Sequence, residues 1–80
     1  MNTYFNKLQG KEVHVMSGVL SKVFSNFEVV EGEEMLSFGE SDSENYDFEI
    51  HKNEIYSYKY SRGLETLRLK SGITVSFIEF

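Results

Sequence analysis

The stretch EIYSYKYSRGLETLRLKSGITVSFIE, residues 54–79, decides the fold class of this chain. Three segments in it, 54–60, 64–70 and 73–79, alternate between apolar and polar residues and are separated by short turns that contain glycine. Alternation with a period of two is typical of half-buried strands. This stretch therefore predicts three consecutive antiparallel strands.

The second turn of the stretch predicts its own register. Residues 70–72 fit a three-residue hairpin loop with Gly72 at the left-handed position. That loop pairs Leu69 with Ile73 and Leu67 with Val75 on an apolar face. The opposite face is polar and collects Thr66, Arg68, Thr74 and Ser76. We expect the core of this region to contain Leu67, Leu69, Ile73, Val75 and Phe77.

The length of the first turn decides where three tyrosines of residues 54–60 lie. A three-residue turn at 61–63 would place Tyr56 opposite Arg68 on the polar face, within reach of a cation–π contact. Exposed tyrosines of this kind could stack on bases or anchor a protein partner. This alternative binding face would consist of Tyr56, Tyr58, Lys59, Arg62, Arg68 and Lys70.

A two-residue turn at Arg62 and Gly63 would instead pair Tyr58 with Leu67 and turn the tyrosines into the core. This register leaves Ile55 on the polar side. Burial of three aromatic rings outweighs one exposed isoleucine, so we favour core tyrosines.

The rest of the chain extends the same pattern. A short helix is expected at the N-terminus over residues 2–10, capped by Thr3 and ended by Gly10. Residues 40–46 are polar and suit a solvated loop. Further strands are expected at residues 11–17, at 19–30 with a bend near Asn26, at 35–38 and around 48–50. The prediction is an all-β domain, a small barrel of about five to seven short antiparallel strands.

Length and composition limit the classes of protein to consider. The 80 residues make one domain, 1–80, whose seven Phe and five Tyr supply the core. Cysteine is absent, which excludes disulfides and thiolate metal sites. We see no signal peptide and no apolar run long enough to cross a membrane, so we expect a cytoplasmic protein.

The charge is concentrated in the middle of the chain. The net charge is −5, which argues against a nucleic-acid binder, and residues 31–49 contain eight acidic groups and no basic one. This acidic stretch comprises Glu31, Glu33, Glu34, Glu40, Asp42, Glu44, Asp47 and Glu49. It could attract a protein with a basic groove over long range, or it could serve only to keep the protein soluble.

No pattern of residues predicts catalysis, a cofactor or a metal. The two histidines, His14 and His51, lie in predicted strands without a serine or carboxylate arrangement typical of a triad. The run Asp42–Asp47 has carboxylates near calcium spacing but lacks the glycine and final glutamate of an EF-hand loop. We expect no enzyme activity, no cofactor and no metal site.

A short N-terminal helix, then Leu8-x-Gly10-Lys11-x-Val13-x-Val15 and several short strands, resembles SH3-like and Sm-like small barrels. The acidic, Tyr- and Phe-rich composition without Cys or Pro is also similar to accessory proteins of phages and mobile elements of Gram-positive bacteria. The resemblance implies a non-enzymatic binding module, such as an inhibitor of a host protein with a basic groove.

Two other functions remain as alternatives: a weak Sm-like nucleic-acid binder that uses the alternative face, and an oligomeric sponge for a small ligand. A protein partner is expected, and nucleic acid and membrane are not. Ile78 and Phe80 face away from Val75 and Phe77. We therefore expect a homo-oligomer at the edge of the C-terminal strand, formed by strand pairing or by burial of this apolar patch.

Overall fold

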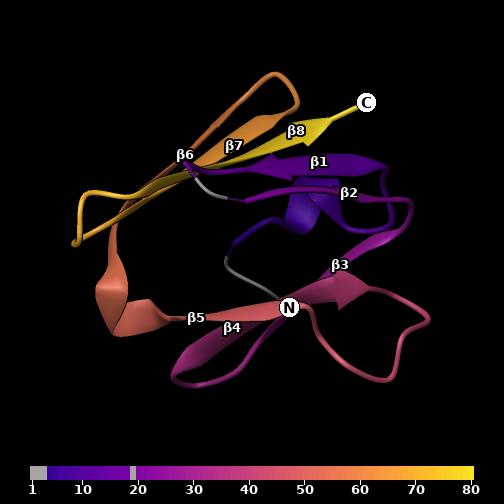
Figure 1. The fold of residues 1–80 in the computed structure, drawn as a ribbon, viewed down its shortest axis with the longest axis horizontal. Coiled ribbons are helices and arrows are strands. Elements are labelled where there is room, and N and C mark those ends of the chain that lie inside the picture. Colours follow the sequence, from indigo (N-terminus) through magenta and orange to yellow (C-terminus); the bar gives the residue numbers. More distant parts are fainter. Residues whose placement is uncertain (1–3, 19) are drawn as a thin grey trace.

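The computed structural model describes residues 4–18 and 20–80 as two antiparallel sheets, one above the other (Figure 1). One sheet has the strand order β2-β1-β8-β7-β6 and the other the order β3-β4-β5. The strands of the described residues are β1 (Val13–Met16), β2 (Ser21–Phe24), β3 (Phe27–Glu31), β4 (Met35–Glu40), β5 (Phe48–His51), β6 (Ile55–Ser61), β7 (Leu64–Leu69) and β8 (Thr74–Glu79). Two 3-10 turns complete them, η1 (Asn6–Leu8) and η2 (Lys52–Glu54).

The all-β prediction is confirmed, with eight strands in the described ranges rather than five to seven. The strands form two sheets and do not close into one barrel. The predicted N-terminal helix is wrong in its described part, which contains only the single turn η1. Phe5, just before that turn, has a φ of 62°, a left-handed conformation that an α-helix cannot include. Thr3, its predicted cap, lies outside the described residues.

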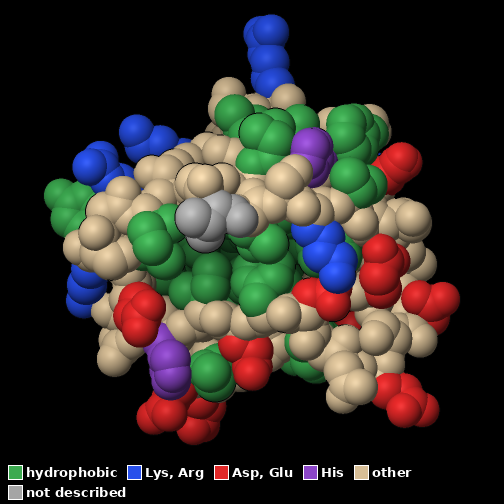
Figure 2. Space-filling model, in the orientation of Figure 1, with side chains coloured by type: hydrophobic (Ala, Val, Ile, Leu, Met, Phe, Trp, Pro, Cys, Tyr) green, Lys and Arg blue, Asp and Glu red, His purple; other side chains and the backbone are tan. Residues whose placement is uncertain are grey.

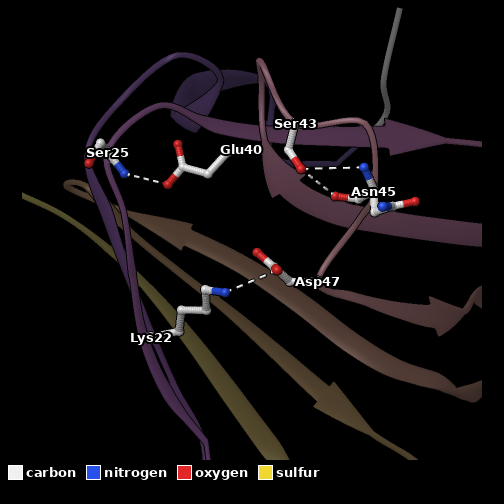
Figure 3. Close-up of polar contacts among 6 residues, drawn as sticks. All are labelled: Lys22, Ser25, Glu40, Ser43, Asn45 and Asp47. Carbon is white, nitrogen blue, oxygen red and sulfur yellow. Dashed lines mark hydrogen bonds and ion pairs between the residues drawn. The ribbon is translucent and has the colours of Figure 1, made fainter.

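The chain passes from one sheet to the other at Ser25 and Asn26, where the predicted bend is confirmed. The Glu40 carboxylate accepts the backbone N–H groups of both residues, at 2.8 and 3.0 Å (Figure 3 draws the first). Since a bend interrupts the strand ladder, these two N–H groups need another acceptor, and Glu40 supplies it.

The outer edge of β3 is covered by the segment that leads into β1. The Gly10 N–H donates to the Phe27 carbonyl, and the Phe27 N–H donates to the Lys11 carbonyl. The Gln9 side-chain amide continues this pairing, since it donates to the carbonyl of Val29 and accepts from its N–H. An edge strand occupied in this way cannot pair with another chain.

The core fills the space between the two sheets. Phe5 lies at its centre, with ring centroids 4.5 Å from Phe77, 5.3 Å from Phe38 and 6.4 Å from Phe27. The buried apolar side chains are Phe5, Leu8, Val13, Val15, Phe24, Phe27, Val29, Leu36, Phe38, Ile50, Leu67, Val75 and Phe77. In the described part of the chain, no helix has the length and apolarity needed to cross a membrane.

Both predicted hairpins of residues 54–79 are present. Arg62 and Gly63 form the two-residue turn, with φ of 44° and 79° as in a type I′ hairpin. At the second turn, Leu67 pairs with Val75 and the Leu69 N–H donates to Ile73, the predicted register.

Of the five predicted core residues here, Leu67, Val75 and Phe77 are buried and Leu69 is half-buried. Ile73 is 50% exposed, so its predicted burial is wrong. It lies in the loop before β8, past the last cross-strand pair, where the sheet ends.

The C-terminal strand is not an edge strand. β8 lies between β1 and β7, and its residues 76–78 pair with both. Strand pairing at a free edge of β8, one of the two expected contacts, is therefore not available there, and the homo-oligomer stays a prediction.

Candidate functional site

The acidic stretch does not form one surface. Glu33 and Glu34 lie in the turn between β3 and β4, whereas Asp42 and Glu44 lie in the loop between β4 and β5, residues 41–47, which we call the acidic loop. A turn and a loop at the two ends of the same strand, β4, are held apart by its six residues. Figure 2 shows Asp and Glu side chains in separate groups at the bottom and at the right.

Half of the acidic stretch takes part in contacts within the fold. Glu31 forms an ion pair with Lys52 at 2.7 Å, and Asp47 forms one with Lys22 at 3.0 Å (Figure 3). Glu40 holds the bend, as described above. The Glu49 carboxylate accepts the Ser37 hydroxyl proton at 3.1 Å.

The remaining carboxylates, those of Glu33, Glu34, Asp42 and Glu44, form no hydrogen bond or ion pair with other described residues. These four are therefore available to a partner.

Glu33 and Glu34 line a cavity of about 350 Å³ with His51, Lys52 and Asn53. The Lys52 N–H donates to the Glu34 carbonyl, which ties η2 to the β3–β4 turn. Lys52 is the cation that lines the cavity, but its ammonium group is neutralised by Glu31. The cavity, which we call the acidic pocket, therefore has an uncompensated negative charge.

A β-bulge decides the position of the tyrosines of β6. The pairing of β6 with β7 shifts by one residue between Ile55 and Ser57, so that Ile55 lies opposite Leu69 and Tyr58 opposite Leu67. The bulged residue is Tyr56, which is 69% exposed. The favoured prediction of core tyrosines is confirmed for Tyr58, which packs against the core, and is wrong for Tyr56 and for Tyr60, which is 40% exposed.

The bulge also allows the cation–π contact between Tyr56 and Arg68 that was expected from a three-residue turn at 61–63. The Arg68 guanidinium lies 5.8 Å from the centre of the Tyr56 ring. These two side chains line a second cavity of about 170 Å³ together with Leu69, Lys70 and Gly72.

The bulge therefore brings three of the six residues of the predicted alternative face together: Tyr56, Arg68 and Lys70. The other three lie elsewhere: Lys59 is opposite Thr66, Arg62 is in the turn, and Tyr58 faces the core.

Glu65 was missed by sequence reasoning. It is fully buried, opposite Phe77 on β8 and Tyr60 on β6. Burial raises its pKa to about 7, although the Phe5 N–H and the Lys7 ammonium act in the opposite direction. The sequence did contain a signal for this burial. Glu65 precedes Leu67 by two residues in the same strand, so its side chain must lie on the same, core-facing side.

The outer face of the five-stranded sheet has an unusual composition. Among the described strand residues that point outward there is no Asp or Glu, although the chain has 13 of them. The face consists of His14, Met16, Ser21, Val23, Ser57, Lys59, Ser61, Leu64, Thr66, Arg68, Thr74, Ser76 and Ile78. Figure 2 shows Lys and Arg side chains mostly at the top and left, away from most of the carboxylates.

The histidines lie on different sheets, His14 on β1 and His51 at the end of β5. Across residues 4–18 and 20–80, no group of three or more His, Asp or Glu side chains is placed to hold a metal ion. Comparison of the chain with family models, with curated proteins and with solved structures found no match.

Proposed function

We propose that this chain is a non-enzymatic protein-binding module that accepts a basic side chain of its partner in the acidic pocket. The partner is a protein with a basic groove, of the kind that a phage-type accessory or inhibitor protein engages. The observation that carries this proposal is that Glu31 neutralises Lys52, the cation that lines the same cavity as Glu33 and Glu34.

The chemistry of the pocket favours a lysine or arginine side chain. Two carboxylates without internal partners attract a cation over roughly 8–10 Å at physiological salt. A guanidinium can also donate several hydrogen bonds to carboxylates that lie around it. The pocket is open to solvent, so we expect its contribution to appear mainly in the rate of association.

A fluorescein-labelled hexa-arginine peptide is a suitable probe for this pocket. We expect it to bind at low salt, to lose affinity as salt rises, and to shift the amide NMR signals of residues 32–34 and 51–53. The double variant Glu33→Gln/Glu34→Gln should weaken binding by about tenfold.

The matched control is Asp42→Asn/Glu44→Gln, which removes the same charge from the loop at the other end of β4. It should weaken binding by no more than about twofold, the effect of net charge alone. Equal losses from both double variants would contradict a specific pocket, as would an absence of shifts at residues 32–34.

A second function is favoured by the bulge at Tyr56. An exposed ring against Arg68, with Lys70 lining the same cavity, could stack on a base and hold its phosphate. Fluorescence anisotropy with a labelled oligothymidine at low salt would detect such binding. Tyr56→Ala should abolish it, and Tyr46→Ala, which removes an exposed tyrosine from the acidic loop, should leave it unchanged.

We further infer that the two sheets are an opened form of an SH3-like or Sm-like small barrel. Two features support this: only Ser25 and Asn26 separate β2 from β3, and residues 10–11 pair with Phe27. In solution, NMR contacts between Lys11 and Phe27 should be as persistent as those within the sheets. Their absence would favour two independent sheets.

A further inference from the structure

Four outward side chains lie in a line across the five-stranded sheet. The registers place Leu64 beside Ile78, Ile78 beside His14, and His14 beside Val23. Side chains at paired positions on adjacent antiparallel strands are about 4.5–5.5 Å apart at Cβ. The four form one continuous row, which we call the outer row.

Two further residues widen the outer row into a patch. The Phe80 ring stacks on the His14 ring at a centroid distance of 5.7 Å, and Phe80 is 67% exposed. Met16 follows His14 by two residues on the same face and is also exposed. In Figure 2, hydrophobic side chains gather around a histidine at the top of the molecule.

This patch has no function inside the fold, because the core lies on the opposite face of the sheet. A contiguous exposed apolar surface on a small protein usually marks an interaction site. Strand pairing cannot cover it, since β8 and β1 both have neighbours on either side. Only a surface laid over the face can do so.

We propose that the outer row is the centre of a two-fold symmetric interface between two copies of this chain. Charge restricts which face a second copy can approach. Each copy carries a net charge of −5, so two copies repel each other through most of their surface. The outer face is where that repulsion is smallest, since its described strand residues include no carboxylate.

The outer row is also complementary to a second copy of itself under a two-fold rotation. A two-fold axis that lies in the interface, parallel to the strands and midway between Ile78 and His14, lays Leu64 of one copy over Val23 of the other and Ile78 over His14. Every apolar side chain of the row then meets the row of the second copy. A symmetric dimer requires this kind of self-complementary patch.

The same axis places a positive charge of each copy at the rim of the dimer. The sheet has one more strand on the β6 side of the axis than on the β2 side, so β6 of each copy extends past β2 of the other. Lys59 lies on β6, and the ion pair between Lys22 of β2 and Asp47 places the acidic loop near β2. Lys22 is opposite the buried Val15, so Lys22 and the acidic loop lie on the core side of β2, and Lys59 of the second copy adds a positive charge beside this edge without forming a new ion pair.

The area of the outer face limits the expected affinity of the dimer. Five strands at about 4.8 Å spacing and about six residues in length give a face of roughly 20 by 20 Å, or ~400 Å² for each copy. This area is at the low end for specific protein interfaces. The dimer should accordingly be weak and should dissociate on dilution.

Sedimentation velocity of the full chain, from micromolar to near-millimolar concentration, tests the interface. We expect a concentration-dependent monomer–dimer equilibrium. Val23→Asp should weaken dimerisation by about tenfold or more, because it buries an unpaired carboxylate in the row. Val23 is 53% exposed on an edge strand, so the variant should keep the wild-type circular dichroism spectrum.

Ile73→Asp is the matched control, since Ile73 is 50% exposed and lies in the β7–β8 loop outside the patch. It should dimerise like the wild type. Lys59→Glu should weaken the dimer more at low salt than at high salt, since it adds a carboxylate at the rim of each copy, and each copy already carries a net charge of −5.

Two results would overturn the dimer. One is a wild-type chain that stays monomeric at near-millimolar concentration. If this monomer binds an apolar dye and Val23→Asp abolishes the binding, the patch serves a different partner. The other is a Val23→Asp variant that dimerises as well as the wild type, which would place the contact on another surface.

Discussion

The Tyr58 hydroxyl hydrogen-bonds to the Glu65 carboxyl group inside the core, beneath the N-terminal segment. The same hydroxyl accepts the Phe5 N–H at 3.1 Å, so the three residues form one chain of hydrogen bonds. The other carboxyl oxygen of Glu65 is buried without a hydrogen-bond partner. A protonated Glu65 fits this environment best, because a buried charge without full pairing is costly.

We expect Glu65 to make stability depend on pH. Burial raises its pKa from 4.5 to about 7 in the folded chain. Below pH 4.5 the carboxyl is protonated in both states, and as the pH rises the unfolded chain loses its proton first. Stability should therefore fall between pH 4.5 and about 7, by up to about 3 kcal/mol, and then level off.

Urea unfolding across this pH range, with wild type and Glu65→Gln, measures the effect. The variant keeps an acceptor for Tyr58 but cannot ionise, so the fall should be absent and the variant should be the more stable protein at pH 8. Glu12→Gln, at an exposed position, should follow the wild type. Parallel curves for Glu65→Gln and the wild type would show that Glu65 ionises freely in the fold.

Leu67→Ala should destabilise the fold by about 2–5 kcal/mol, because Leu67 is fully buried between the sheets and its loss leaves a cavity. Chemical denaturation gives the value directly. Ile73→Ala is the control at a half-exposed position and should cost less than about 0.5 kcal/mol. A loss under about 0.5 kcal/mol at Leu67 would mean that the strand faces are reversed.

Glu40→Ala should cost about 1–3 kcal/mol, because two backbone N–H groups at the bend between β2 and β3 lose their charged acceptor. Glu44→Ala removes the same type of side chain from the acidic loop and should be nearly neutral. Differential scanning calorimetry of the two variants separates a structural carboxylate from a solvated one. Equal melting temperatures would rule out the assigned role of Glu40.

Arg62→Asn should stabilise the fold by about 0.5–1 kcal/mol. Arg62 has a φ of 44° in a two-residue turn, and Asn before Gly is the preferred pair for that geometry. Arg62→Lys keeps an unfavourable residue there and should leave the melting temperature unchanged. If Asn and Lys behave alike, backbone strain at this turn is not a significant cost.

The elements that the sequence predicted well depend on neighbours along the chain. The two hairpins of residues 54–79 follow from turns whose residues specify the geometry, and the registers of β6, β7 and β8 follow from those turns. The bend near Asn26 was also predictable, because a stretch of twelve residues is too long for one strand of a small sheet. The failure at residues 2–10 has a local cause as well, a left-handed Phe5 that no sequence rule predicts for a bulky residue.

The site features were decided by contacts between distant parts of the chain. Ile55 and Tyr58 are three positions apart and could not both face the core in a regular strand. The bulge at Tyr56 resolves this conflict, because it places Ile55 opposite Leu69 and Tyr58 opposite Leu67. The carboxylates of residues 31–49, which are adjacent in sequence, were separated by the length of β4 and divided between ion pairs and solvent.

By itself, the sequence determined that this chain is an all-β domain with defined C-terminal hairpins, because alternation and turn chemistry act within a few residues. Only the tertiary structure decided that β8 lies between β1 and β7, that Glu65 is buried under Phe5, and that the described strand residues facing outward on the five-stranded sheet include no carboxylate. The physical reason is that strand order and burial depend on which distant segments pair, and pairing is chosen by the packing of the whole core.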